Sequence, residues 1–429
     1  MKIAIVGTGI SGLMCAHRLH PHHDVALFEA NDYVGGHTHT VDVEVDGTHH
    51  AVDTGFIVYN ERNYPAFTAL LAELGVATQP SVMNFSVHDE RTGLEYRSNG
   101  LGGIFAQPAN AVRPGFARML ADIVRFNHQA RDLVERHRQA VETGDRSGAA
   151  ALEAVTLEHL VSLGGYGERF RHQVLVPLGS AIWSADPAQF LEFPALAYAR
   201  FMDNHGLLRL RGRPQWRTIT GGSRSYVDAL SAPFADRIRL GAAVHKIRRS
   251  RPGIEVVSLG HGAEQFDRII LAGHSDQSLQ LLSDPSDAER DVLAGIRYQP
   301  NVATLHTDER FLPRRRRAWA SWNTQVGVHD GPAGVTLTYW MNQLQSIRSA
   351  RQILVTLNRH DQIRPDTVLG RFEYDHPVYD LEAQRAQGRA DEIQGVNGTY
   401  FAGAYWGYGF HEDGVQSALD VVRRIEAEP

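Results

Sequence analysis

The order of apolar and polar residues predicts short buried strands that lead through glycine turns into helices at both ends of the chain. Ile3–Val6 is an apolar run, and residues 24–28 (DVALF) form a second run after a stretch with helical spacing. Thr399–Ala402 repeats the strand pattern near the other end. A helix is predicted from Asp413 onwards, and we interpret Glu412 and Asp413 as N-terminal helix residues rather than catalytic acids. The apolar positions of this helix are Val415, Ala418, Leu419, Val422 and Ile425.

The segments between these two ends predict a mixture of helices and strands. Residues 115–137 predict a long amphipathic helix, and residues 175–208 predict helices joined by an aromatic-rich turn. Residues 302–308 and 333–345 have the composition of strands. No internal repeat or low-complexity tract interrupts this pattern. We therefore expect an α+β unit between the two ends.

Composition sets broad limits on the class of protein. A chain of 429 residues predicts two or three domains, and its 43% apolar and 21% charged residues are ordinary for a globular protein. The net charge of −6 gives no reason to expect nucleic acid as a partner. The single cysteine, Cys15, excludes an intrachain disulfide and a cysteine-based zinc cluster. The N-terminus has no secretory apolar region, and no run is long enough to span a membrane, so we expect a cytoplasmic protein.

A phosphate-binding motif follows the first predicted strand. Gly7, Gly9 and Gly12 form the pattern G-x-G-x-x-G between a strand and a helix. Gly7 allows the tight turn, Gly9 lets the backbone approach a pyrophosphate, and Gly12 lets helix and strand pack closely. Glu29 ends the second strand, where a carboxylate can accept hydrogen bonds from a ribose diol. Strand, helix, strand and acid in this order predict a dinucleotide site.

The next segment distinguishes FAD from NAD. A second glycine pair, Gly35-Gly36, precedes alternating strands that lead to VDTGFIV at residues 52–58. This layout resembles the FAD-binding half of the flavoprotein superfamily that contains amine oxidases, phytoene desaturases and protoporphyrinogen oxidases. The resemblance implies a Rossmann-type, glutathione-reductase-like α/β domain with an inserted α+β substrate domain, and non-covalent FAD. Many amine oxidases have Arg directly after the glycine pair, where this chain has His37. Compensation of phosphate charge is therefore expected to be weaker or pH-dependent here.

The same resemblance extends to later segments. In that superfamily a C-terminal strand ends in a small-residue turn and a helix points its N-terminus at the flavin, which matches residues 399–425. Residues 218–230 and 238–247 resemble the turn and the strand that return into the FAD domain, with Val244 at the adenine. The implied FAD-binding residues are Gly7, Gly9, Ile10, Ser11, Gly12, Glu29, Ala30, Gly35, Gly36, His37, Thr38, Gly55, Phe56, Val244, Gly403, Gly414 and Val415. The implied domains are residues 1–75, 218–273 and 391–429 for FAD, and 76–217 and 274–390 for the substrate.

Aromatic and polar residues of the middle segments and the last loop are candidates for the substrate pocket. The candidates are Trp183, Asn204, His205, Tyr339, Trp340, Trp406, Tyr408 and His411. For a catalytic role we select Trp406, Tyr408, His411, Asn204 and His205. The histidine-rich stretches GGHTHT and GTHH resemble metal-binding sequences. Their residues alternate on predicted strands and belong to the predicted FAD-binding segment, so we predict that they bind no metal.

The scarcity of lysine limits the reactions that a flavin site in this chain is expected to perform. Several amine oxidases use a substrate-domain lysine and a water at flavin N5, but only Lys2 and Lys246 occur here, outside the segments expected there. The chain also resembles a narrower group of predicted NAD/FAD-binding proteins associated with bacterial cyclopropane and methyl-branched fatty-acid modification. We therefore expect dehydrogenation or desaturation of a lipid-like, fatty acyl substrate. A flavin-dependent double-bond isomerase, an amine oxidase and a non-catalytic partner of a lipid methyltransferase remain alternatives.

Four consecutive arginines, at residues 314–317, stand between aromatic residues. The simplest interpretation is a solvated loop. The alternative is a peripheral contact with anionic lipid headgroups, which would suit a lipid substrate.

Overall fold

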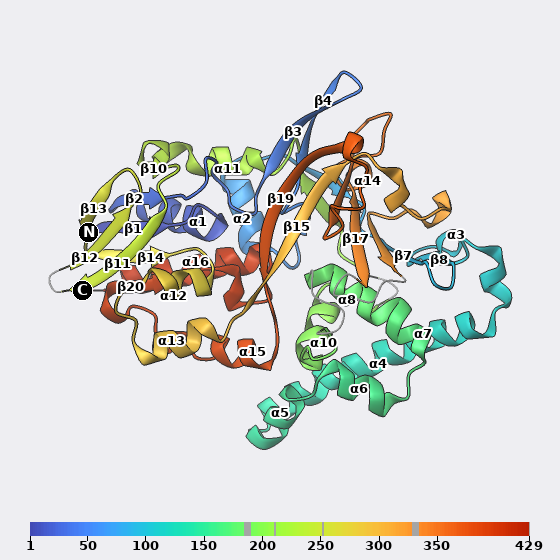
Figure 1. Ribbon diagram of the computed structural model, residues 1–429. Helices are drawn as coiled ribbons and strands as arrows, with labels where there is room; N and C mark the ends of the chain where they lie inside the picture. Colours follow the sequence, from blue (N-terminus) through green and yellow to red (C-terminus); the bar gives the residue numbers. More distant parts are fainter. Residues whose placement is uncertain (184–189, 210–211, 251–252, 328–333, 429) are drawn as a thin grey trace.

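The computed structural model describes residues 1–183, 190–209, 212–250, 253–327 and 334–428. A parallel sheet near both chain termini organises one lobe, and a mixed sheet with a group of helices organises the other (Figure 1). The two lobes lie side by side, joined by several passages of the chain.

In the described residues, five strands form the parallel sheet. Their order across the sheet is β10 (Ile238–Arg239), β2 (Asp24–Phe28), β1 (Lys2–Val6), β14 (Arg268–Leu271) and β20 (Thr399–Phe401). Each neighbouring pair is parallel, so all the carboxyl ends meet at one edge. This arrangement confirms the predicted Rossmann-type α/β architecture.

Both faces of the parallel sheet are covered, which explains why its strands are continuously apolar. Ile3 and Ile5 on β1 pack with the helices α1 (Ile10–Leu19) and α16 (His411–Glu426). Ala4, between them, faces the opposite core. That opposite core is shared with an outer antiparallel sheet of β11 (Val244–Ser250), β12 (Gly253–Ser258) and β13 (Gly262–Phe266).

The mixed sheet carries the second lobe. Its described strands are, in order, β19 (Val368–Pro377), β15 (Tyr298–His306), β18 (Leu354–Leu357), β17 (Val335–Trp340), β16 (Trp322–Val326), β7 (Phe85–Asp89) and β8 (Leu94–Arg97). Only the β16–β7 pair is parallel among these described neighbours. The predicted strand at residues 302–308 corresponds to β15. The strand predicted over residues 333–345 is β17 only as far as Trp340, because Met341–Leu344 forms the short helix α14, and residue 333 lies outside the described residues.

Helices gather below the mixed sheet around their own apolar core (Figure 1). They are α4 (Pro114–Glu142), α5 (Arg146–Glu153), α6 (Leu157–Gly164), α7 (Glu168–Phe170), α8 (Val176–Trp183) and α10 (Ala195–Asn204). The long amphipathic helix predicted over residues 115–137 is α4, which buries Phe116, Phe126 and Leu133 along one side. The last residue of α8, Trp183, and Phe201 in the second half of α10 place aromatic side chains against Phe410, next to the parallel sheet's lobe.

Smaller elements complete the two lobes and the junction between them. They are the hairpin β3 (Thr40–Val45) and β4 (Thr48–Asp53), the small sheet β5 (Tyr59–Asn60), β9 (Trp216–Ile219) and β6 (Thr78–Ser81), and the helices α2 (Pro65–Glu73), α3 (Leu101–Ile104), α11 (Arg224–Ser231), α12 (Ser275–Leu281), α13 (Asp287–Ala294), α14 (Met341–Leu344) and α15 (Leu381–Gln387). The hairpin β3–β4 and the small sheet cross the predicted domain boundaries. Val43 and Val52 of the hairpin pack in the core of the mixed sheet, and β6 pairs with β9. The domain limits given by the sequence stay a prediction.

Candidate cofactor and substrate site

The carboxyl edge of the parallel sheet collects the segments with cofactor motifs. Val6 is in register with Phe28 on one side and with Leu271 on the other, and Leu271 is in register with Phe401. The next residues along these strands therefore emerge together at one edge. These residues are Gly7, Glu29, Ala272 and Ala402. Ligands of open α/β sheets bind at this edge.

The glycines of the first turn have distinct reasons to be glycine. A Cβ on Gly12 would overlap the Gly7 carbonyl oxygen, and Gly7 itself has φ +102°, a left-handed conformation that side chains disfavour. Gly9 differs, because no described heavy atom lies within 4 Å of a Cβ built there. Gly36 approaches from the other side, and a Cβ on it would lie 3.2 Å from the Gly9 Cα. Gly9 thus faces open space, and the backbone of Gly36 approaches it closely from the other side. This arrangement leaves room for a bound pyrophosphate.

The first turn of α1 supplies donors to this space. Ile10, Ser11 and Gly12 begin the helix, and the N–H groups of a first helical turn have no partner within the helix. All three residues are buried. The arrangement fits a phosphate group held by backbone N–H donors and by the positive end of the helix dipole.

Glu29 is buried and already engaged by the protein. Its Oε2 atom accepts hydrogen bonds from the Thr8 backbone N–H at 2.9 Å and the Thr8 hydroxyl at 2.6 Å. Its Oε1 atom accepts from the Asn31 backbone N–H at 2.9 Å and the Asn31 side-chain amide at 3.0 Å. These four bonds fill the acceptor positions of a carboxylate. The predicted ribose contact therefore requires a ribose hydroxyl to replace one of these donors, and exposed Asn31 is the easiest to displace.

The predicted adenine end lies beside Glu29. The Ala242 N–H donates to the Glu29 carbonyl at 2.8 Å, and the Gly241 N–H donates to Asn31 at 2.9 Å. Val244 follows two residues later at the start of β11 and is half-buried. Ala30, by contrast, is exposed. The structure thus brings Val244 to the Glu29 end of the site.

The first and last helices of the site are interlocked. The Ser11 hydroxyl donates to the Gly414 carbonyl at 3.0 Å, and a Cβ on Gly414 would lie 2.9 Å from Ile10. Val415 next to Gly414 is fully buried. Gly403, at the end of β20, donates its N–H to the Ser417 hydroxyl at 3.0 Å. The N-termini of α1 and α16 therefore open side by side, and α16 begins at His411, two residues before the predicted start.

The two carboxylates at the start of α16 hold neighbouring segments in place. Glu412 accepts the backbone N–H groups of Ala66 at 3.0 Å and Phe67 at 2.9 Å, and so caps α2. Asp413 accepts the N–H groups of Tyr408 at 3.0 Å and Phe410 at 2.9 Å. Burial raises the pKa of Asp413 to about 6, although these two N–H donors oppose the shift. Asp413 thus shapes the loop at residues 403–410, and Glu412 holds the start of α2, in line with the interpretation of both acids as helix-start residues.

His411 lies in a hydrogen-bonded chain that crosses the site. Its Nε2 atom lies 2.6 Å from the Tyr226 hydroxyl, which lies 2.6 Å from the Thr38 hydroxyl. The ring stacks on Phe56 with centroids 3.8 Å apart. Burial lowers the pKa of His411 to about 3, so the imidazole is neutral at pH 7. Gly55, beside Phe56, has no room for a side chain because a Cβ would overlap the His37 carbonyl.

In the aromatic loop between Gly403 and His411, some side chains pack in the apolar cores and others lie near α10. The Trp406 indole N–H donates to the Phe401 carbonyl at 3.0 Å, and its ring packs against the apolar cores at β20 and α15. Tyr408 is half-buried and lies near Phe201, with ring centroids 6.5 Å apart. Tyr405, which the sequence did not single out, is buried, and its hydroxyl has no partner among the described residues. The Trp406 side chain thus packs in the apolar cores, and the Tyr405 hydroxyl lacks a hydrogen-bond partner among the described residues.

The other predicted substrate residues separate into two groups. His205 is buried, with its ring 3.9 Å from that of Phe201 and Nδ1 2.9 Å from the Phe201 carbonyl, and burial lowers its pKa to about 4. Asn204, next to it, is exposed at the end of α10. Tyr339 and Trp340 lie on β17 and pack against Trp322 and Trp319, away from the cavity described below. Trp183 lines that cavity.

Three histidines from distant segments meet behind the Gly35-Gly36 turn. The ring of His37 lies 6.0 Å from His274 and 5.6 Å from His376. Burial lowers the pKa of His37 to about 4 and that of His376 to about 3, and it also lowers the pKa of His274. His37 Nε2 and His274 Nδ1 are buried and have no hydrogen-bond partner among the described residues. This neutral histidine cluster leaves polar atoms for a ligand, while His37 adds no positive charge at the phosphates.

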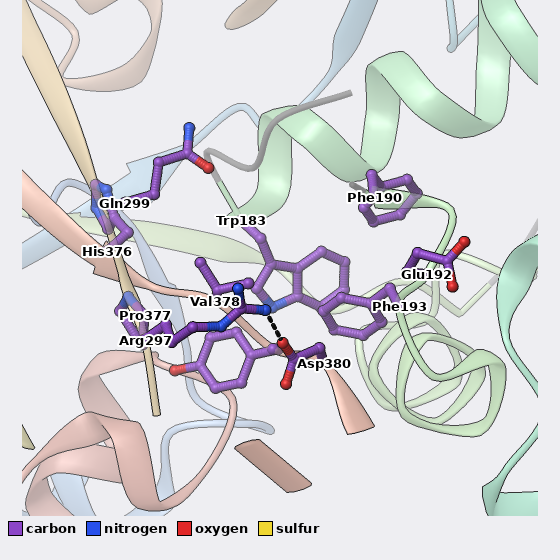
Figure 2. A pocket seen from close by; sticks show the side chains of 11 residues that line it. Trp183, Phe190, Glu192, Phe193, Arg297, Gln299, His376, Pro377, Val378 and Asp380 are labelled. Atoms are coloured by element: carbon purple, nitrogen blue, oxygen red, sulfur yellow. Dashed lines mark hydrogen bonds and ion pairs between the residues drawn. The ribbon is translucent and has the colours of Figure 1, made fainter. Parts of the chain in front are cut away.

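A cavity of about 310 Å³ extends from this histidine cluster to the surface. Figure 2 shows the rings of Trp183 and Phe193 near its centre, with centroids 4.7 Å apart. Arg297 forms an ion pair with Asp380 beside them. The lining residues are Trp183, Phe190, Glu192, Phe193, Arg297, Gln299, His376, Pro377, Val378, Tyr379 and Asp380. Tyr379 also joins the wall to the last loop, since a Cβ on Gly409 would overlap its hydroxyl.

Sequence reasoning missed most of the histidine cluster and the cavity wall. His274 had a usable signal, because it comes two residues after Ala272 at the carboxyl edge of the sheet. His376 and Tyr379 come from the end of β19 and had no comparable signal. Their neighbours in space are distant in sequence.

The described residues form neither a metal centre nor a membrane-spanning helix. No group of three or more His, Cys, Asp or Glu side chains among them is arranged to hold a metal ion. None of the helices within the described ranges is long and apolar enough to cross a bilayer. Lys2 lies over Phe266, 4.5 Å from the ring centroid, and Lys246 is exposed on β11. Lys2, at the start of β1, thus places its ammonium group against the outer sheet, and Lys246 is on that sheet.

Comparison with known proteins agrees with this geometry. The family model of flavin-containing amine oxidoreductases matches residues 10–426. AofH of Mycobacterium tuberculosis, named as a flavin-containing monoamine oxidase, is 26% identical over 261 residues. This match covers 60% of the chain and 54% of AofH, so the chain matches about half the length of that curated relative.

Two solved structures show the same fold at low identity. A triple mutant of putrescine oxidase superposes with a TM-score of 0.71 at 18% identity, over 99% of this chain and 98% of that one. A CLA-producing fatty acid isomerase from P. acnes superposes with a TM-score of 0.64 at 15% identity, over 98% of both chains. The family match confirms the predicted superfamily, the FAD cofactor and the oxidoreductase class. The chain therefore belongs to the family of flavin-containing amine oxidoreductases.

Proposed function

We propose that the protein removes a hydride from a carbon atom of a lipid-like, fatty acyl substrate. FAD, when bound in the glycine cradle, supplies the acceptor for the hydride. The observation that carries the proposal is the aromatic cavity that opens beside the histidine cluster and the last loop. The residues of the chain act by binding and orienting the substrate and by excluding water.

The cavity wall favours an apolar chain. Trp183, Phe193 and Tyr379 present ring surfaces, and Phe190 and Val378 extend the apolar wall. Burial of each methylene of a substrate in such surroundings contributes about 0.8 kcal/mol. An acyl chain therefore gains affinity with length until the cavity is filled. A small polar amine lacks this contribution.

Arg297 offers a position for the head group of the substrate. Its side chain is 61% exposed at the cavity and pairs with Asp380, which also caps α15 through the Ala383 N–H at 2.8 Å. A guanidinium has five N–H donors, so the ion pair leaves some for a carboxylate. This placement supports an acid or acyl head group at the cavity mouth.

The position of the two lysines also supports chemistry on carbon. The Lys2 ammonium group lies over Phe266 of the outer sheet, and Lys246 is exposed on β11 of the same sheet. The lysine and water that several amine oxidases use have no counterpart on the cavity wall, since the chain has no third lysine. Amine oxidation keeps one specific observation in its favour. Glu192 also lines the cavity and could pair with an ammonium group.

The test is anaerobic mixing of the holoprotein with candidate substrates while flavin absorbance is followed. Saturated and unsaturated fatty acids should bleach the flavin, and simple amines and polyamines should leave it oxidised. Arg297→Gln should weaken the response to fatty acids, while Glu192→Gln is the matched control at the same cavity. Bleaching by a polyamine that Glu192→Gln abolishes, with fatty acids inert, would overturn the proposal.

Product analysis separates the remaining alternatives. A dehydrogenase yields a product with one more double bond and a reduced flavin. An isomerase shifts a double bond while the flavin stays oxidised at steady state. A protein that only accompanies a lipid methyltransferase gives neither change.

A further inference from the structure

Two arginine-rich segments meet near β8 and α3, at the end of the mixed sheet that lies farthest from the chain termini (Figure 1). Residues 96–121 contain three arginines and no acid, and residues 311–327 contain four arginines and no acid. The rest of the chain must therefore be strongly acidic, because the net charge is −6. We propose that the surface of these two segments docks the protein on a bilayer of anionic phospholipid. We call it the arginine edge, formed by Leu101, Val112, Arg113 and residues 314–317.

Glu95 holds the two segments of the arginine edge together. Its carboxylate is buried and accepts the backbone N–H groups of Arg314 at 2.7 Å and Arg315 at 3.2 Å. The Glu95 backbone N–H donates to the Gln107 side chain at 3.2 Å, next to the short helix η1 (Pro108–Val112). The Glu95 carboxylate is therefore used inside the structure to fix the backbone of the arginine loop.

A second connection fixes α3 beside the same loop. Arg97 donates to the Trp319 carbonyl at 3.4 Å, directly after the short helix η5 (Arg316–Ala318). α3 packs over Arg97, since a Cβ on Gly103 would lie 2.7 Å from Arg97 Nε. Leu101 on α3 is therefore held on the same side of the molecule as the arginine loop.

The arginine edge combines free positive charge with exposed apolar side chains. Residues 314–317 are all exposed, and within the described ranges the guanidinium groups of Arg314, Arg316 and Arg317 form no ion pair with a carboxylate, whereas that of Arg315 pairs with Glu95. Leu101 is 75% exposed and Val112 is 82% exposed. A purely solvated loop explains the arginines but not the large exposed apolar residues next to them. A bilayer surface accommodates both, with guanidinium groups at the headgroups and apolar side chains below them.

The electrostatic contribution gives an expected size for the effect. Each arginine near an anionic membrane surface strengthens binding about fivefold. Two arginines together therefore account for about a thirtyfold change in affinity. The attraction should weaken as salt is raised, because the surface potential is screened within a Debye length.

The experiment is vesicle sedimentation with the full-length holoprotein. Vesicles of phosphatidylcholine with about one-third phosphatidylserine should bind it, and vesicles of phosphatidylcholine alone should bind it much less. The double variant R314Q/R317Q should bind about thirtyfold more weakly. The control R136Q/R146Q removes two exposed arginines on α4 and α5 and should bind as the unmodified protein does. Flavin absorbance and thermal midpoint verify that each variant is folded.

The apolar residues of the arginine edge are tested by a separate variant with its own control. Leu101→Ser with Val112→Ser should weaken vesicle binding further at high salt, where the charge contribution is screened. Leu163→Ser on α6 is the control, because Leu163 is 76% exposed on another surface. Equal vesicle binding by R314Q/R317Q and R136Q/R146Q would overturn the proposal. Binding to duplex DNA in preference to anionic vesicles would also overturn it, since the partner would then be nucleic acid.

Discussion

Asp53 and Gln345 exchange two hydrogen bonds across the junction of the two lobes. The Asp53 N–H donates to Gln345 Oε1 at 2.9 Å, and Gln345 Nε2 donates to Asp53 Oδ2 at 2.9 Å. Asp53 also accepts from Thr40 at 2.6 Å and from the Ser223 hydroxyl at 2.7 Å. It is fully buried, and burial raises its pKa to about 6 despite these donors. The two residues couple the hairpin β3–β4 to α14.

Replacement of Gln345 should loosen this junction. Gln345→Ala leaves the buried Asp53 N–H without its partner and removes one of the two donors to Asp53 Oδ2, which costs about 1–3 kcal/mol of unfolding free energy. Chemical denaturation measures the loss. Gln362→Ala is the matched control, because Gln362 is exposed, and it should change stability little. Equal stability of the two variants would show that water replaces the two hydrogen bonds between Asp53 and Gln345 without a loss of free energy.

Gly9 and Gly12 should respond differently to the same substitution. Gly9→Ala has space in the protein alone, so the apoprotein should keep its thermal midpoint while FAD binding falls sharply. Gly12→Ala places a Cβ against the Gly7 carbonyl and should destabilise the fold itself. Thermal unfolding with and without added FAD separates the two effects. A Gly9→Ala variant that binds FAD normally would contradict the assignment of the cradle.

Glu29→Ala should weaken FAD binding about 10- to 150-fold, the equivalent of a charge-assisted hydrogen bond of about 1.5–3 kcal/mol. The turn that carries Thr8 and Asn31 also loses its anchor, so the apoprotein should be less stable as well. FAD titration followed by flavin fluorescence measures the first effect. Asp32→Ala, at an exposed neighbouring acid, is the control and should leave both properties near those of the parent.

Release of FAD by acid should be complete. The single cysteine, Cys15, is fully buried on α1 with Sγ 3.8 Å from the Ala418 carbonyl, and burial raises the pKa of its thiol. It therefore offers no thiolate to a flavin ring. Acid precipitation should leave yellow supernatant and colourless pellet. Flavin that remains with the pellet would reveal a covalent link to another residue.

The unfolding free energy should fall as pH is lowered from about 6.5 towards 4. Buried histidines have folded pKa values below their unfolded value, so the unfolded state binds protons first in this window. For His306, a shift from 6.5 to about 4 corresponds to a few kcal/mol. Asp53 and Asp413, whose pKa values are raised to about 6, oppose the trend below that pH.

His306 provides the direct test of this pH dependence. It is buried, its Nδ1 accepts the Asp308 N–H at 3.0 Å, and its Nε2 lies 2.7 Å from the Thr356 hydroxyl. His306→Gln should flatten the fall of the unfolding free energy between pH 6.5 and 4, whatever its effect at pH 7. His22→Gln on the surface is the control for the loss of one histidine. An unchanged slope in His306→Gln would assign the dependence to other groups.

The sequence predicted the cradle because its requirements are local. Gly7, Gly9 and Gly12 act within one turn, and apolar runs on either side specify strands buried on both faces. The histidine cluster could not be predicted in the same way. His37, His274 and His376 meet only because a turn, the end of β14 and the end of β19 converge. Likewise, residue order does not tell which of Tyr405 and Trp406 has its polar atom satisfied by Phe401.

The hydrogen bond between Ser11 and Gly414 has a consequence for the order of biosynthesis. The two residues are 403 positions apart, so at about 5–20 residues per second the ribosome adds Gly414 roughly 20–80 s after Ser11. During that interval the emerging chain has a glycine cradle without the helix that closes it. Capture of the dinucleotide is therefore a late event, completed when α16 docks against α1. Until then the nascent protein has an open apolar groove along α1, which is the surface that a chaperone would shield.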